Sequence, residues 1–312
     1  MSVFKELKTF FKIIKHLSEI KKQYTHVIVH THSTKAGLLG RWAAFFARIP
    51  SRIHTVHGFG FNHFQPRIIW ATIYLLELIT SLITTKYICV SQTDVNTGTK
   101  LFPRFNAQLI RAAVSDNYFI SAHKTHFNQK IISPFIFGTV ACFKKQKNLF
   151  DLLYAFELVH QKHAHARLEL IGDGILRPQI ESWIQTHNLT HTITLHGWQH
   201  DIVPIMHSWQ AFVLTSLWEG LPCAVVEARL LKLPVISYKT GGIPEVIHYH
   251  INGFLCEQKD WLSCTLAMQK IIENHALRTK LSTHSDDFTY FRETTMIAQH
   301  IKLYQNTTPP SV

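Results

Sequence analysis

The residues best suited to chemistry lie in one stretch of this chain, where seven residues separate Glu219 from Glu227. An apolar run at residues 211–214 predicts a buried strand that ends in the polar loop holding Glu219. Leu221-Pro222 predicts the start of the helix that carries Glu227, because proline suits the first helical turn. Both carboxylates are therefore expected near the carboxyl end of a strand, the edge where open α/β sheets bind ligands.

Two consecutive glycines follow the next predicted strand. Residues 234–237 are mostly apolar and end shortly before Gly241-Gly242, after which another helix is expected. Glycines let backbone N–H groups approach a phosphate, and a helix N-terminus adds partial positive charge. Taken alone, the glycines also fit an ordinary loop and cap of a Rossmann-like domain. Together with the two glutamates, they indicate a binding site.

The composition allows one large domain or two medium ones, because the chain has 312 residues and 46% of them are hydrophobic. Strand-like and helix-like segments alternate, which predicts parallel α/β sheets. The formal net charge of +12 favours polyanions such as anionic lipid, nucleic acid or phosphorylated substrates. The lysines are dispersed rather than clustered with aromatic residues, which argues against nucleic acid.

The cysteines and the N-terminal segment indicate a cytosolic protein. The five cysteines are odd in number and show no C-x-x-C pair, as expected for free thiols. Lysines at positions 5, 8, 12 and 15 interrupt the first segment, which therefore does not resemble a signal peptide.

Two helices with strong apolar character are expected in the first half. Residues 3–20 are amphipathic, and their apolar stripe either packs on the sheet of its own domain or lies on a membrane surface. Residues 68–83 form the longest apolar run. Because this run is short for a membrane span and contains Glu77, it predicts a buried helix.

Histidines are frequent, at 22 residues, and two groups have spacings found in metal sites. These groups are His30-x-His32 and His160-x-x-His163-x-His165, but no acidic or cysteine partner accompanies either. Solvated or hydrogen-bonded imidazoles are expected rather than metal ligands.

Glu-x7-Glu, followed by Pro-Val-Ile and by Gly-Gly-x-x-Glu, resembles the nucleotide-sugar site of retaining glycosyltransferase family 4. The stretches at residues 27–34 and 54–61 resemble members that build bacterial lipopolysaccharide and capsule. The resemblance implies the GT-B fold, with two Rossmann-like domains facing a cleft. It also implies an N-terminal domain at residues 1–130 and a nucleotide-sugar domain at 131–312, whose last helices return to the first domain.

The N-terminal domain departs from the family pattern. Family members open with a strand and a glycine-rich loop at the donor diphosphate, whereas the first glycine here is Gly37 and no strand is expected before residue 26. The domain is therefore expected to lack its first βα unit or two, either because the start is internal to a longer chain or because the protein is a shortened version.

The resemblance also assigns roles to single residues. Glu227 would accept the ribose hydroxyls of the donor, and Glu219 would orient the hexose. Lys147, with the N–H groups of Gly241 and Gly242, would stabilise the departing diphosphate without a metal ion.

Further positions match the family less strictly. His57 matches a histidine beside the transferred sugar, Trp198 lies in the loop near the base, and Gly172 forms a tight turn in the same domain. Cys142 stands where the family commonly has an arginine on the diphosphate, so Lys144 or Lys145 would have to substitute for it without a bidentate grip.

The resemblance implies a metal-independent enzyme without a cofactor. It would transfer a hexose or N-acetylhexosamine from a nucleotide-sugar, with UDP favoured, to a lipid-linked saccharide. Its expected location is the cytoplasm or the inner face of the cytoplasmic membrane, in peripheral contact with anionic lipid. The alternative is an inactive family member that binds a nucleotide or a partner.

Overall fold

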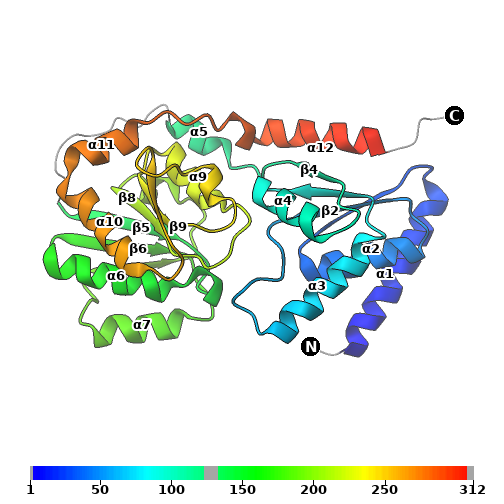
Figure 1. Cartoon of the computed structure of the whole chain (residues 1–312), viewed down its shortest axis with the longest axis horizontal. Helices are drawn as coiled ribbons and strands as arrows, with labels where there is room; N and C mark the ends of the chain where they lie inside the picture. Colours follow the sequence, from blue (N-terminus) through cyan, green and yellow to red (C-terminus); the bar gives the residue numbers. More distant parts are fainter. Residues whose placement is uncertain (1–2, 123–132, 308–312) are drawn as a thin grey trace. The chain divides into compact units, whose positions relative to one another are not determined.

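The computed structural model describes residues 3–122 and 133–307 (Figure 1). The chain divides into two compact units. Unit 1 comprises residues 1–112 and 294–312, and unit 2 comprises residues 113–293. The predicted domain boundary at residues 130–131 lies outside the described residues. The last helix belongs to unit 1, so the chain returns to its first unit after completing the second.

Unit 1 is built on a four-stranded parallel sheet with the order β1-β2-β3-β4. Strands and helices alternate, as the sequence pattern predicts. Its strands are β1 (Ile28–His32), β2 (Ser51–Val56), β3 (Lys86–Cys89) and β4 (Ala107–Leu109).

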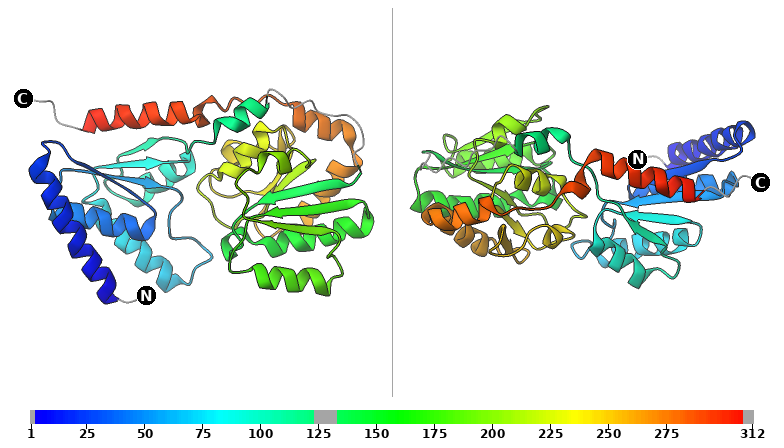
Figure 2. Two further views of the ribbon diagram at one scale, coloured as in Figure 1. Left: turned by 180° about the vertical axis from the view of Figure 1, so that it is seen from behind. Right: turned by 90° about the horizontal axis from the view of Figure 1, so that it is seen from above.

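The helices of unit 1 connect these strands, and α1, α2 and α3 lie side by side (Figures 1 and 2). Ser91 caps α4, since its side chain accepts a hydrogen bond from the Asp94 N–H. The helices are α1 (Val3–Gln23), α2 (Thr34–Phe46), α3 (Arg67–Ser81), α4 (Gln92–Leu101) and α12 (Glu293–Thr307).

Unit 2 contains a six-stranded parallel sheet with the order β10-β9-β8-β5-β6-β7. The chain builds β5, β6 and β7 outward in one direction and then returns to place β8, β9 and β10 on the other side of β5. The strands are β5 (Phe135–Val140), β6 (Ala166–Ile171), β7 (Ile193–Gly197), β8 (Ala211–Leu214), β9 (Val235–Tyr238) and β10 (Gly253–Cys256).

The helices of unit 2 cover both faces of its sheet (Figure 1). One large core, which includes fully buried Phe137, Phe156 and Met268, joins β5, α6 and α10. The helices are α5 (Asp116–Ala122), α6 (Leu149–Lys162), α7 (Arg177–Thr186), α8 (Val203–Met206), α9 (Cys223–Leu230), α10 (Trp261–Glu273) and α11 (His275–Thr283), with short 3-10 turns η1 (Lys145–Lys147), η2 (Ile243–Glu245) and η3 (Thr289–Phe291).

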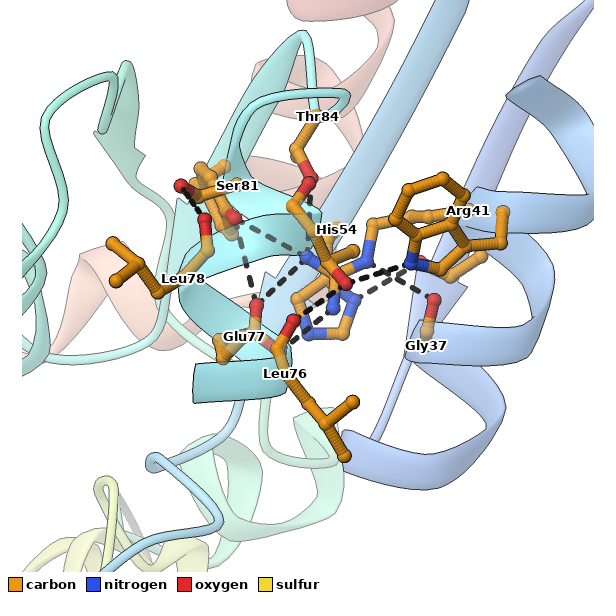
Figure 3. Close-up of polar contacts among 12 residues, drawn as sticks. Gly37, Arg41, His54, Leu76, Glu77, Leu78, Ser81 and Thr84 are labelled. Atoms are coloured by element: carbon orange, nitrogen blue, oxygen red, sulfur yellow. Dashed lines mark hydrogen bonds and ion pairs between the residues drawn. The ribbon is translucent and has the colours of Figure 1, made fainter. Parts of the chain in front are cut away.

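The burial of α3 contradicts its prediction as a buried helix. The Ile68 side chain is 81% exposed, whereas the carboxylate-bearing Glu77 is 5% exposed. The cause is Arg41 on α2, which is fully buried and pairs with Glu77 inside the unit, so the apolar side of α3 faces outward (Figure 3). None of the described helices is long and apolar enough to span a bilayer.

Candidate active site

The sheet of unit 2 has a topological switch point between β5 and β8, where the direction of strand addition reverses. Open α/β sheets bind ligands in the crevice outside the carboxyl ends of the strands at such a point. Lys147 follows β5 and Glu219 follows β8, so the two strands that flank the switch point each supply one charged side chain.

Lys147 and Glu219 form an ion pair, with their side chains 15% and 8% exposed. The loops that carry them are joined by further hydrogen bonds. The Leu217 N–H donates to the Gln146 carbonyl oxygen at 2.8 Å, and the Gln146 side-chain amide donates to the Trp218 carbonyl oxygen at 2.6 Å. The two loops therefore form one connected structure at the carboxyl edge of the sheet.

Glu227 lies on α9, next to the same edge, and its carboxyl group is largely removed from water. Burial raises its pKa from 4.5 to about 7, and a hydrogen bond from Tyr118 partly opposes that rise. Tyr118 lies on α5, which packs against α9. Glu227 thus titrates near neutral pH, unlike a solvated glutamate.

The Gly241-Gly242 turn follows β9 and contacts the Glu219 loop directly. Gly241 has a φ of +52°, and a Cβ there would lie 2.2 Å from the Glu219 carbonyl oxygen. The Gly242 N–H donates to the Gly220 carbonyl oxygen at 2.5 Å. The helix expected after the glycines is only the 3-10 turn η2, because Pro244 lies within it and the chain turns on towards β10.

The loops that follow β6 and β7 carry the two remaining candidate residues of unit 2, Gly172 and Trp198. Gly172 has a φ of +121°, and a Cβ there would lie 2.1 Å from the Ala141 carbonyl oxygen, so glycine is required for this turn. The Gly172 N–H donates to the Gly197 carbonyl oxygen at 2.8 Å. Trp198 follows directly and is 68% exposed, so its ring is free to stack on a planar ligand.

Histidines gather at the carboxyl edge of the sheet of unit 1. His32 ends β1 and His57 follows β2, and their ring nitrogens Nδ1 and Nε2 lie 3.0 Å apart. Desolvation and the charge of His32 lower the pKa of His57. His30 is bonded to Tyr304 Oη and Thr55 Oγ1, each at 2.7 Å, and its pKa falls to about 4, mainly through burial. The described residues contain no group of three or more histidines, cysteines or acids placed to bind a metal.

Comparison with known proteins identifies the family. The family described as "Glycosyl transferases group 1" matches residues 123–287. UDP-Gal:alpha-D-GlcNAc-diphosphoundecaprenol alpha-1,3-galactosyltransferase of Escherichia coli is 30% identical over 287 residues, which cover 89% of this chain and 73% of the relative. The chain is a group 1 glycosyltransferase. The capsular polysaccharide biosynthesis glycosyltransferase CapM of Staphylococcus aureus is 24% identical and covers 89% of this chain and 74% of its own.

Solved glycosyltransferase structures share the fold of this group 1 enzyme. Anabaena HepE in complex with UDP-glucose has a TM-score of 0.79 at 18% identity and covers 95% of this chain and 82% of its own. Sucrose-phosphate synthase from Thermosynechococcus elongatus has a TM-score of 0.80 at 19% identity, with coverage of 98% and 80%. The fold is GT-B, as the motifs predict.

In this group 1 glycosyltransferase, the predicted donor residues come together in unit 2. Lys147, Gly172, Trp198, Glu219 and Gly241-Gly242 all follow neighbouring parallel strands, and Glu227 lies on the helix after Glu219. His57 belongs to unit 1, where it pairs with His32. The sequence does not predict a role for Tyr118. No pattern around this tyrosine relates it to a glutamate on a helix far along the chain.

Proposed function

We propose that this glycosyltransferase transfers a hexose or N-acetylhexosamine from a UDP-sugar to a lipid-linked saccharide, with retention of configuration, in bacterial cell-surface polysaccharide synthesis. The donor class is supported by the Escherichia coli relative, whose name includes UDP-Gal, and by the HepE complex with UDP-glucose. The acceptor class is supported by the diphosphoundecaprenol in the name of that relative.

One observation carries this proposal. A lysine, a glutamate and a glycine turn, suited to a diphosphate and a sugar, follow β5, β8 and β9, which lie next to one another in the sheet at its switch point. A nucleotide-sugar has its charge concentrated on the diphosphate and its hydroxyl groups on both sides of it. A cation paired with one carboxylate, and a second carboxylate on the helix that follows, can serve those two kinds of group.

Each residue then has a distinct part in the transfer. Ionised Glu227 accepts hydrogen bonds from the ribose hydroxyls, and Trp198 stacks near the base. The Lys147 ammonium stabilises the diphosphate as its negative charge grows, with the N–H groups of the Gly241-Gly242 turn. Glu219 fixes the orientation of the transferred sugar, and His57 assists by hydrogen bonding to it. In this account the charge stabilisation comes from protein groups, without a cofactor or a metal ion.

Donor binding requires two local exchanges of partner. Lys147 is paired with Glu219, and the Gly242 N–H is bonded to Gly220. An incoming diphosphate competes with the carboxylate of Glu219 for the lysine, which frees that carboxylate to accept sugar hydroxyls. The sugar and the phosphate would thus replace the ion pair together.

A second candidate function is that of a nucleotide- or partner-binding module without transferase activity. It is favoured by Cys142, which occupies the position where the resemblance implies an arginine, and by the pairing of Lys147 with Glu219. Such a module would bind UDP without transferring a sugar.

A transfer assay separates these functions. Purified full-length chain is incubated with radiolabelled UDP-galactose, UDP-glucose or UDP-N-acetylglucosamine and with N-acetylglucosamine-diphosphoundecaprenol. Label in the lipid fraction from one donor, reduced at least about 10²-fold by Glu219→Gln, supports the enzyme. UDP binding without transfer from any donor supports the binding module.

A further inference from the structure

Helix α3 has its polar and apolar sides reversed relative to an ordinary surface helix. The buried side carries Glu77, whose two carboxylate oxygens accept hydrogen bonds from Arg41 at 2.7 and 2.9 Å (Figure 3). The outer side carries Ile68, Leu75 and Ile79, of which Leu75 is 54% exposed. An exposed isoleucine or leucine needs no explanation alone. Three large apolar side chains along one helix side, with exposed Thr72 among them, indicate an interaction surface.

The buried polar contacts fix α3 against α2. Arg41 also donates to Thr84 Oγ1 at 3.1 Å, and the Trp42 indole N–H donates to Thr80 Oγ1 at 2.9 Å. Breaking a buried pair of this kind leaves an uncompensated charge, so α3 cannot easily rotate to bury its apolar side. The packing of the unit therefore keeps the apolar side of α3 exposed.

Helices α1 and α2 extend this apolar surface. Phe4 and Phe11 on α1 are exposed, and so is Phe46 on α2. A groove of about 400 Å³ between the two helices is lined by Leu7, Phe10, Leu38, Leu39, Trp42 and Phe46, together with Glu6. Trp42, which lines this groove, also donates to Thr80 Oγ1 on the buried side of α3, so α2 contacts both α1 and α3.

Lysines accompany the apolar side chains on α1. Lys8 and Lys15 follow Phe4 and Phe11 by four residues, so each lies beside an exposed phenylalanine, and both are exposed. Lys5 and Lys12 are exposed on the adjacent strip. Glu6, which lies at the groove, is paired with Lys35. The charge next to the apolar surface is therefore positive.

We propose that the apolar face, formed by Phe4, Phe11, Phe46, Ile68, Leu75 and Ile79 on α1, α2 and α3, docks on a bilayer that contains anionic lipid. The apolar side chains enter the boundary between headgroups and acyl chains, and the α1 lysines contact the anionic headgroups. An amphipathic surface flanked by cations is complementary to such a bilayer. The inference rests on the proposed function in one respect, since a lipid-linked acceptor places the substrate at the same membrane.

Vesicle flotation of the full-length chain tests the inference without donor or acceptor. The vesicles contain phosphatidylethanolamine with phosphatidylglycerol, or phosphatidylcholine alone. The chain is expected to float with the anionic vesicles and to bind the neutral ones much more weakly. Exchanging Lys8, Lys12 and Lys15 together for glutamine is expected to lower partitioning by about fivefold per lysine.

A matched pair of variants tests the apolar part. Leu75→Glu, on the apolar face, is expected to lower partitioning about tenfold or more. Leu262→Glu, on α10 of unit 2, is the control, because both leucines are 54% exposed. Circular dichroism and UDP binding show whether each variant is folded.

Four results would overturn the inference. The first two are failed flotation with intact UDP binding and equal binding of neutral and anionic vesicles. The others are equal effects of the two leucine variants, and a dimer in sedimentation that Leu75→Glu dissociates while vesicles are not bound. Failed flotation with intact UDP binding contradicts the docking surface alone. Intact flotation without UDP binding contradicts the proposed function alone.

Discussion

Lys147 and Glu219 form a largely buried ion pair that joins the loops after β5 and β8 at the switch point of unit 2. The pair holds Lys147, which we propose stabilises the diphosphate, beside Glu219, which we propose orients the sugar. Its two members have different roles in the proposed reaction, and each neutralises the other before the donor arrives. This relationship links the stability of unit 2 to the chemistry of the site.

Removing one partner of this pair is expected to destabilise the protein. Lys147→Met leaves the Glu219 carboxylate buried without a cation, which should cost about 3–5 kcal/mol in the free energy of unfolding. The double variant Lys147→Met/Glu219→Gln should recover most of that loss. Urea denaturation measures both, and equal losses in the single and double variants would argue that the ion pair has no such role.

UDP affinity is expected to depend on pH through Glu227. In the proposed site, ribose hydroxyls donate to the ionised carboxylate of Glu227, and burial raises the pKa of that carboxyl to about 7. Binding should therefore be about tenfold weaker at pH 6 than at pH 8. Tyr118→Phe removes a hydrogen bond that lowers this pKa, so the midpoint of the profile should move to higher pH.

Glu227→Gln is the control for this profile, because the phosphate of UDP also titrates near pH 6. The variant should keep only the phosphate contribution to the pH dependence. An unchanged profile in Glu227→Gln would mean that the carboxylate does not contact the ligand.

The same raised pKa affects stability with a defined sign. Between pH 4.5 and about 7 the folded chain keeps a proton on Glu227 that the unfolded chain has released. The contribution of this group to stability is therefore greatest below pH 4.5 and is lost as pH rises to about 7. Glu227→Gln should remove this contribution to the pH dependence of stability. Thermal unfolding measured between pH 4.5 and about 7 tests it.

A pair of glycine variants tests the contact between the glycine turn and the Glu219 loop. Gly241→Ala and Gly197→Ala both place a side chain at positive φ, which costs about 1–2 kcal/mol. Only Gly241→Ala also meets a backbone oxygen at 2.2 Å, since a Cβ at 197 would have Arg177 Nη1 as its nearest neighbour, at 3.7 Å. Gly241→Ala should lower the melting temperature more, and the reverse order would contradict the contact.

The sequence predicts the strands of unit 2 and the loops that follow them well, because both depend on local signals. The apolar run at residues 211–214 coincides with β8, and the proline at 222 directly precedes α9. Glu219 and the glycines could be placed because the carboxyl ends of parallel strands share one edge, and Lys147 through the family resemblance. The pairing of the Lys147 and Glu219 side chains could not be predicted, since it depends on the distance between two separate loops.

Two features could be found only in the structure: which side of α3 is buried, and the raised pKa of Glu227. The outward face of α3 follows from the pairing of Glu77 with Arg41, which joins two helices that sequence periodicity treats separately. The raised pKa of Glu227 likewise depends on its burial beside Tyr118 on α5, a contact between two helices that sequence periodicity treats separately.

His57 is expected to assist transfer without being indispensable. His57→Ala should lower kcat by about 10- to 10²-fold, the effect of losing one hydrogen bond. Measurable transfer should remain, because the proposed charge stabilisation comes from unit 2. His32→Gln retains a side chain that can bond to His57 and should have a smaller effect. Steady-state kinetics measure both variants, and complete loss in His57→Ala would instead indicate an essential base.

Calorimetric titration with UDP and GDP tests the central claim that unit 2 binds a nucleotide-sugar at its switch point. The account predicts micromolar binding of UDP, weaker binding of GDP, and loss of UDP binding in Glu227→Ala. Glu157→Ala, at a partly buried glutamate on α6, should bind UDP normally. Failure of the parent chain to bind either nucleotide, or unchanged binding in Glu227→Ala, would contradict the account.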